Sequence, residues 1–324
     1  MYNKTSCFSL DNLDLRCCFA EAAEMKYKTY FSIIFASSIV FLILSPVAVV
    51  GNALILAAIW KRTFQRTWLY VLLSGLALSD FCIGLIVQPL LALCYFLFLD
   101  ESGVVDAQKH LNAYIIITYV GLMSGTFFSN VELILITLLS IERWLHMSRR
   151  SLMMTPHRRC VAVTLLLVVP AFFVVSNVVQ QLRRGRLGVA LTIINVVVIV
   201  LCYLITSFAY YKLYRIIRQH QQQVQGNQSS QNFGQPAINL AKYKRSVKSM
   251  LYIFALFSVT LTPVVGGMAF LLSRAENLSC LEAIAVFYVS LSICFLSSSL
   301  NPAIYLWRMN EVREGVKSLF WANV

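Results

Sequence analysis

Long stretches without charged side chains recur along the chain and alternate with short segments rich in lysine and arginine. Five stretches contain no charged residue at all: 29–60, 160–182, 187–211, 249–273 and 283–307. Two more, 67–99 and 110–141, contain one each, Asp80 and Glu132. Because about 20 apolar residues cross a bilayer as a helix, all seven stretches are long enough. The pattern predicts an all-α membrane protein, a seven-transmembrane helix bundle.

The short connections predict one compact unit with two flanking segments. Residues 1–29 form an extracellular N-terminus, 30–308 the seven spans, and 309–324 an amphipathic helix with a short cytosolic tail. In that last segment Val312, Val316, Leu319 and Phe320 repeat at helical spacing, which is typical of a short eighth helix lying along the membrane surface. A Gln-rich, uncharged tract at 220–241 is expected to be a flexible loop.

The basic residues are unequally divided between the two sides of the predicted bundle. One side carries 18 lysines and arginines and the side with the N-terminus carries nine. The positive-inside rule therefore predicts a multi-pass plasma-membrane protein with its N-terminus outside. The net charge of +13 then lies on one membrane face, where anionic lipid and an acidic cytosolic partner account for it and nucleic acid is not needed. A composition of 59% hydrophobic and 13% charged residues excludes an ordinary cytosolic enzyme.

Three groups of polar residues fall at membrane depth. Asp80 and Glu132 are carboxylates, and the run Ser297–Ser299 precedes Asn301 and Pro302 in the seventh stretch. Charged groups are costly there and normally face a polar cavity, which makes both acids functional candidates. Two interpretations remain open: an ion- and water-holding site, or a hydrogen-bonded polar core without a ligand. Neither requires catalysis.

Five motifs occur in order, each in a different predicted span. They are Gly51-Asn52, Leu76-Ala77-Leu78-Ser79-Asp80, Glu142-Arg143-Trp144, Pro263 with Phe257 six residues before it, and Asn301-Pro302-Ala303-Ile304-Tyr305. Over roughly residues 30–321 the chain resembles a rhodopsin-like (class A) G-protein-coupled receptor. The resemblance implies a receptor that converts binding of an extracellular ligand into activation of a heterotrimeric G protein, with arrestin as a second cytosolic partner.

The resemblance also implies a polar centre that holds a sodium ion in the inactive state. Its residues here are Asn52, Asp80, Ser297 and Asn301, with Glu132 where the family usually has a serine. A second acid strengthens cation binding or traps a proton, and both interpretations stay open. No other cofactor or metal is expected.

A second implied group serves activation and G-protein coupling. Arg143, after Glu142, resembles the arginine that meets the G protein, with Tyr203 and Tyr305 as its active-state partners. The same machinery includes Phe257, Pro263 and Pro302. Two departures are notable. Leu261 replaces the usual aromatic before the span-six proline, and Tyr243 stands where many members carry an acid, which predicts raised basal signalling.

The extracellular side departs further from the family. Thr118 occupies the region of the usual span-three cysteine, so the customary disulfide cannot form; Cys280 with Cys17 or Cys18 is the candidate disulfide instead. Asn3 and Asn277 are candidate glycosylation sites. A short second outer loop and a span five without proline are similar, weakly, to melanocortin receptors and their lipid and adenosine relatives.

Candidate positions for ligand contact lie in spans two, three and seven. Gly121, Gly125, Ser129 and Glu132 follow one face of span three, where small residues leave room for a ligand or for a close helix neighbour. Gly125 stands where amine receptors carry an aspartate, which argues against an amine, and span seven has no lysine for retinal. The candidate ligand pocket comprises Gln88, Gly125, Thr126, Ser129 and Tyr288.

Two other functions were weighed against a receptor. A membrane transporter would favour repeated halves, and seven spans without an internal repeat do not divide in this way. An intramembrane hydrolase would use Asp80 and Glu132 as an acid/base pair, but it has no use for the Glu142-Arg143 and Asn301–Tyr305 motifs. The sequence therefore favours a receptor and not an enzyme.

Overall fold

The computed structural model describes residues 8–9, 12–13, 28–61, 68–99, 107–148, 156–182, 186–226, 240–274 and 280–320. The first span is α2 (Lys28–Lys61), and the second combines α3 (Trp68–Cys82), the π-helix η3 (Ile83–Val87) and α4 (Gln88–Leu99). The next four are α5 (Ala107–Met147), α6 (Pro156–Leu182), α7 (Arg186–Gly226) and α8 (Leu240–Arg274). The seventh joins α9 (Cys280–Cys294) to α10 (Leu296–Arg308), and α11 (Asn310–Phe320) follows.

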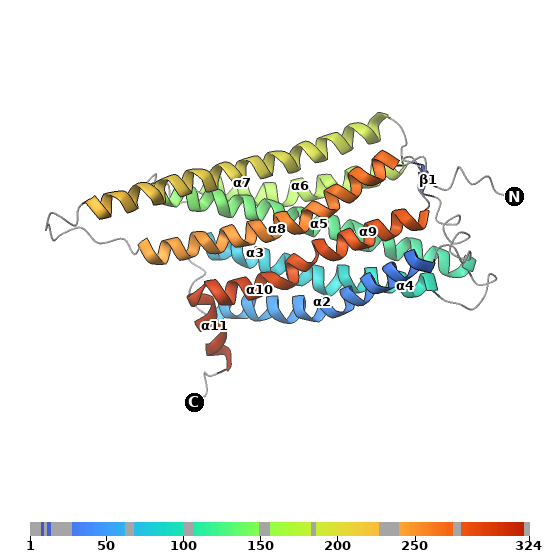
Figure 1. The fold of residues 1–324 in the computed structure, drawn as a ribbon, viewed down its shortest axis with the longest axis horizontal. Helices are drawn as coiled ribbons and strands as arrows, with labels where there is room; N and C mark the ends of the chain where they lie inside the picture. The colour runs from blue at the N-terminus through green and yellow to red at the C-terminus, as the bar shows by residue number, and fades with distance from the viewer. Residues whose placement is uncertain are drawn as a thin grey trace.

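The spans run side by side, and α11 leaves their direction at one end of the bundle (Figure 1). At the opposite end lies a two-stranded antiparallel ribbon of β1 (Phe8–Ser9) and β2 (Asn12–Leu13). The predicted fold, a seven-helix bundle with a short eighth helix, is confirmed. We call the half of the bundle nearer α11 the α11 half and the other half the far half.

One expectation about the connections was wrong in its bounds. The tract 220–241 was expected to be a loop, but α7 continues to Gly226 and α8 begins at Leu240. Glutamine is a good helix former, so the run after His220 extends a helix already nucleated in the bundle. Only residues 183–185 separate α6 from α7, which agrees with the short second outer loop expected from the sequence.

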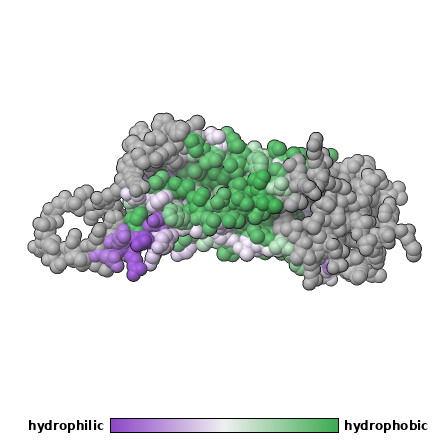
Figure 2. Space-filling view, turned by 90° about the horizontal axis from the view of Figure 1, so that it is seen from above, coloured by the Kyte–Doolittle hydropathy of each residue, from purple (hydrophilic) through white to green (hydrophobic). Residues whose placement is uncertain are grey.

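Length and composition agree with a membrane-spanning bundle. Six spans are long and apolar enough to cross a bilayer, and the described apolar part of α8 is shorter, Leu251–Gly267. Figure 2 shows hydrophobic side chains in a broad band over the middle of the face in view, with hydrophilic ones gathered toward the α11 end. Large exposed side chains such as Val259 and Ile193 are what a lipid-facing surface requires.

A proline and a serine explain the π-helix in the second span. In η3 the backbone N–H of Gln88 donates to the carbonyl of Ile83, five residues back. The next residue, Pro89, has no N–H to donate to the carbonyl of Gly84. The hydroxyl of Ser45 in α2 donates to that carbonyl instead, at 2.8 Å. Gly84 permits the close approach, since a Cβ there would lie 2.7 Å from that of Ala48.

Two apolar clusters fill the bundle. The cluster of the α11 half joins α2, α3, α5, α8, α10 and α11, and includes Leu76, Leu139, Phe257, Tyr305 and Val312. The cluster of the far half joins α2, the second span and α9, and includes Phe41, Val87, Leu91, Tyr288 and Phe295. Phe41 holds this second cluster together by ring contacts of 6.2 Å with Tyr288 and 6.3 Å with Phe295.

Candidate functional site

The two buried acids and Asn301 come together between the clusters. The Nδ2 of Asn301 donates to Asp80 Oδ2 at 2.8 Å and lies 3.4 Å from Glu132 Oε1. All three side chains are buried, with Asp80 wholly inaccessible to solvent. One amide therefore bridges carboxylates from the second and third spans. Two carboxylates held this close in a low-dielectric interior can be ionised together only where positive charge offsets their repulsion.

Asn52 belongs to the polar centre because it replaces a backbone hydrogen bond that Pro302 cannot make. A proline cannot donate to the carbonyl four residues back, which leaves Ser298 without its helical partner. Asn52 Nδ2 donates to that Ser298 oxygen at 2.9 Å and to its own helix at Ala48 O, also 2.9 Å. Gly51 makes room for the ring, because a Cβ there would lie 2.9 Å from Pro302 Cγ. The Gly-Asn and Asn-Pro motifs thus fit each other across α2 and α10.

Four buried oxygens at this centre have no hydrogen-bond partner in the part of the chain that the structure describes. They are Asn52 Oδ1, Asp80 Oδ1, Ser298 Oγ and Asn301 Oδ1. The hydroxyl of Ser298 lies beside the Asp80 carboxylate. By contrast, the hydroxyl of Ser297, the serine singled out from the sequence, donates to the Cys294 carbonyl at 2.8 Å. Carboxylate, amide and hydroxyl oxygens are the ligands that a hard cation prefers.

Arg143 lies buried at the end of α5, beside Glu142. Its Nε is 3.8 Å from Glu142 Oε2, and the residue is 8% exposed. The hydroxyls of Tyr70 and Tyr210 lie within electrostatic reach of its guanidinium. Tyr70 also donates a hydrogen bond to Glu311 in the first turn of α11. The arginine is therefore next to a contact between the second span and α11.

The span-five tyrosine expected to meet Arg143 is placed elsewhere. Tyr203 packs against Phe254 of α8 with ring centroids 5.7 Å apart, and it lies toward Glu132. Tyr210, two turns further along α7, stacks on the same Phe254 at 5.6 Å and is the one near Arg143. The role of Tyr203 as an active-state partner stays a prediction. Tyr203 and Tyr210 are seven residues apart on one face of α7, so the sequence alone does not distinguish which of them lies near Arg143.

The other residues of the expected activation machinery meet in the cluster of the α11 half. Phe257 and Tyr305 are buried there, and Leu261 packs against it. Tyr305 has a buried hydroxyl without a hydrogen-bond partner among the described residues, and it lies on the side of Asp80 and Glu132. Pro263 stands inside α8, two turns beyond Phe257. The side chain of Tyr243 lies outside the described part of the chain.

Three of the five candidate pocket residues are packed closely against other helices, and the other two are half-buried. Gln88 and Tyr288 are buried in helix contacts: Gln88 Nε2 lies 3.3 Å from Phe295 O, and the Tyr288 hydroxyl 3.3 Å from Leu91 O. Gly125 is packed closely against other residues and does not line an open cavity, since a Cβ there would lie 3.1 Å from Val87 and 3.2 Å from Phe295. Thr126 and Ser129 are half-buried on the same helix.

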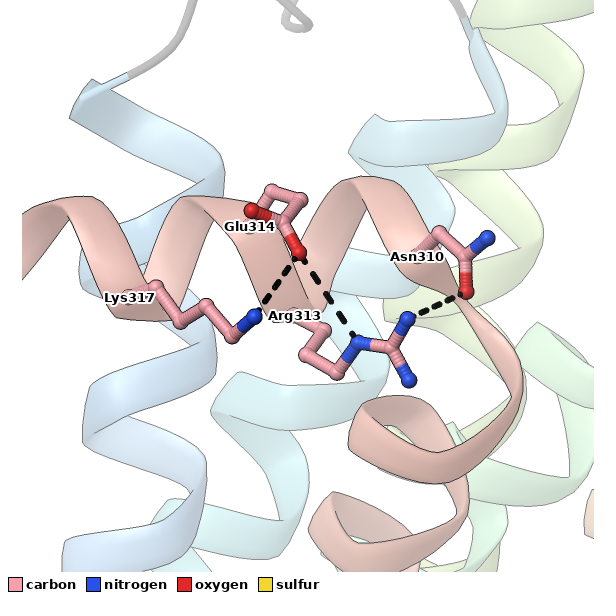
Figure 3. Close-up of polar contacts among 4 residues, drawn as sticks. All are labelled: Asn310, Arg313, Glu314 and Lys317. Carbon is pink, nitrogen blue, oxygen red and sulfur yellow. Dashed lines mark hydrogen bonds and ion pairs between the residues drawn. The ribbon is translucent and has the colours of Figure 1, made fainter.

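Helix α11 rests on α2 through its small and apolar side chains. A Cβ at Gly315 would lie 3.1 Å from that of Ala58, and Val312 is buried. Its exposed face carries charges: Lys317 Nζ and Arg313 Nε lie 3.2 Å and 3.9 Å from Glu314 Oε1 (Figure 3). Arg313 also donates to Asn310 Oδ1 at 3.0 Å. The predicted amphipathic helix is confirmed.

Several expected features lie outside the described residues. These are the candidate glycosylation sites Asn3 and Asn277, and Cys17 and Cys18 of the candidate disulfide. Cys280 begins α9, but its side chain is not described. Thr118 occupies the region where the family usually has the span-three cysteine, and its hydroxyl donates to the free thiol of Cys94 at 3.3 Å.

The seven spans, the proline-fitted polar centre and the buried arginine define a seven-helix transmembrane receptor bundle. Residues 51–305 match the family described as 7 transmembrane receptor (rhodopsin family), and the chain belongs to that family. A crystal structure of squid rhodopsin has the same fold, with a TM-score of 0.68 and 17% identity over 90% of this chain and 86% of that one. No curated protein matches the sequence. The family is a class of receptors, and the protein crosses the membrane several times.

Proposed function

We propose that the chain is a plasma-membrane receptor that converts binding of an extracellular ligand into activation of a heterotrimeric G protein. The observation that carries this proposal is the place of Arg143. A guanidinium held beside Glu142 and the Tyr70–Glu311 contact, at the end of the bundle, is available to a partner once its neighbours move. The N-terminus lies outside and the α11 end faces the cytosol, in agreement with the excess of basic residues there.

The connection between the two ends of the receptor runs through the cluster of the α11 half. Phe257 of α8 and Tyr305 of α10 pack in this cluster under the polar centre, so a movement of either helix alters both regions. A ligand drives such a movement only by binding one arrangement more tightly than the other. Arrestin would use the same cytosolic surface. Within the described part of the chain, no specific contact supports transport or hydrolysis.

The test compares ligand-free activation of every G-protein class in cells expressing the native chain or Arg143→Ala at equal surface level. We expect a basal signal that falls to the level of untransfected cells in the variant. Arg313→Ala removes an exposed arginine from α11 and serves as the matched control, with signal unchanged. A basal signal that survives Arg143→Ala would contradict the role given to this residue. The G-protein class that responds identifies the cytosolic partner.

We also propose that the polar centre holds a sodium ion. Asn52, Asp80, Glu132 and Asn301 supply the oxygens, and Ser298 takes the place expected of Ser297. The sodium ion would supply the positive charge that offsets the repulsion between the two carboxylates. In purified receptor, the thermal midpoint should rise when sodium replaces choline at constant ionic strength. Asp80→Asn should remove most of this rise; an equal rise in both proteins would exclude the site.

A further inference from the structure

An arginine at the end of the seventh span lies against two neighbouring aromatic rings. Arg308 Cζ is 4.7 Å from the ring centroid of Tyr252 in α8 and 4.5 Å from that of Trp307, its neighbour in α10. The two rings are 5.6 Å apart and tilted by 42°. A cation within about 6 Å of an aromatic centroid is attracted by the electrons of its face. The contact with Tyr252 therefore joins helix α8 to helix α10.

The two sides of this contact differ in their exposure. The Nε of Arg308 is buried and has no hydrogen-bond partner among the described residues. The rings are therefore the partners that the structure shows for this cation. Tyr252 and Trp307 turn much of their outer surface away from the bundle, with 41% and 62% exposed. Because both rings are partly exposed, the contact is expected at the weaker end of the range for cation–π pairs.

The contact lies next to buried residues of the cluster of the α11 half. The residue after Tyr252, Ile253, is 1% exposed, and Phe257 is buried one turn further along α8. Both belong to the cluster that includes Tyr305 of α10. If α8 moves away from α10, Arg308 loses the Tyr252 ring and this cluster opens. While the contact holds, the cluster stays closed beneath the face that carries Arg143.

We propose that Arg308 and Tyr252 form a cation–π clamp that holds α8 against α10 in the resting receptor. The clamp restrains α8, which packs in the same cluster as Tyr70 and Tyr305 beside Arg143, and in giving this restraint a role in signalling it rests on the proposed function. It also offers this chain a restraint on span six that does not depend on an acid at Tyr243. Release of one such contact shifts the equilibrium between closed and open forms by about two- to five-fold.

The first test measures the position of α8 without any G protein. Hydrogen–deuterium exchange of the segment 249–257 is followed in the purified full-length receptor in lipid nanodiscs. We expect about two- to five-fold faster exchange in Arg308→Gln, and exchange close to native in Arg308→Lys, which keeps the cation. Arg313→Gln removes the same charge from the exposed face of α11 and should leave α8 unchanged. Native exchange in a folded Arg308→Gln receptor would overturn the clamp.

A second pair of variants approaches the contact from α8. Tyr252→Leu removes the ring, and Tyr252→Phe keeps an aromatic face for Arg308. Faster exchange in the leucine variant alone is expected, and this pair decides the matter if Arg308→Gln fails to fold. Equal exchange in both Tyr252 variants would overturn the clamp.

The same variants in cells separate this inference from the proposed function. Basal G-protein signal should rise about two- to five-fold in Arg308→Gln and Tyr252→Leu, in parallel with their exchange. Faster exchange without signal in any variant would leave the clamp established and contradict the proposed coupling. A raised signal with native exchange would establish coupling and overturn the clamp.

Discussion

The α11 half and the far half of the bundle bury polar side chains in different ways. Toward α11, ionisable groups are buried and each meets partners from other spans or from its own helix end: Asp80 and Glu132 share Asn301, and Arg143 lies beside Glu142. Among the described residues of the far half, the buried polar side chains are neutral, as in Gln88, and aromatic rings fill the space between helices.

This difference agrees with where the sequence follows the family and where it departs. The five motifs lie in or beside the α11 half, and there the fitted pairs of residues come from distant parts of the chain. The far half lacks the cysteine of span three and shows close packing at Gly125. The half that carries the family motifs is thus the half with the fitted polar contacts, whereas the far half departs from the family sequence.

The largest expected effect comes from removing the amide between the two carboxylates. Asn301→Leu should lower the free energy of unfolding by about 2 kcal/mol or more, because Asp80 and Glu132 lose the hydrogen-bond donor that they share. Gln88→Met in the far half removes a single 3.3 Å hydrogen bond and should cost about 1 kcal/mol. Thermal unfolding of the purified receptors measures both. Equal losses would show that the two halves do not differ in this respect.

A glycine-to-alanine pair tests whether the far half is closed at Gly125. The added methyl would lie 3.1 Å from Val87 and 3.2 Å from Phe295, so Gly125→Ala should cost about 1 kcal/mol. A methyl added at Gly266 would have no atom within 4 Å, and Gly266→Ala should gain about 0.5 kcal/mol from a stiffer unfolded chain. Thermal midpoints give the comparison. Stabilisation by both substitutions would indicate open space beside Gly125, as a ligand pocket there requires.

The spans and the polar centre could be predicted because their signals are local or chemically costly. Seven gaps between charges located the seven spans, and the expense of carboxylates at membrane depth singled out Asp80 and Glu132. Asn301 was expected near them and lies 2.8 Å from Asp80. The eighth helix followed from the spacing of its apolar residues.

Other features depend on how side chains from different helices meet, which the sequence does not encode locally. The π-helix needs Ser45 of α2 opposite the carbonyl of Gly84, and Gly125 could face either open space or Phe295. The same holds for Arg308, which sequence analysis counted only as one more basic residue near the cytosol. Its proximity to Tyr252 depends on the crossing of α8 and α10.

A smaller effect is expected where the family usually has a disulfide. Thr118→Val keeps the shape of the side chain and removes its hydrogen bond to Cys94, which should cost up to about 1 kcal/mol. Thr262→Val removes a bond within α8 at an exposed position and serves as the control, with a smaller loss. Thermal unfolding with and without a reducing agent measures both. A large loss for Thr118→Val that appears only without reductant would mean that Cys94 is not a free thiol.

The smallest effect is expected on the exposed face of α11, where charges also meet but water competes for them. Glu314→Gln removes the contacts with Lys317 and Arg313, and all three side chains are about half exposed. Such pairs contribute below about 0.5 kcal/mol and weaken further with added salt. Glu311→Gln on the same helix should cost more, because Glu311 accepts from the buried Tyr70. If thermal midpoints showed Glu314 to be the costlier of the two, the stability of α11 would depend on its surface charges rather than on its contact with the second span.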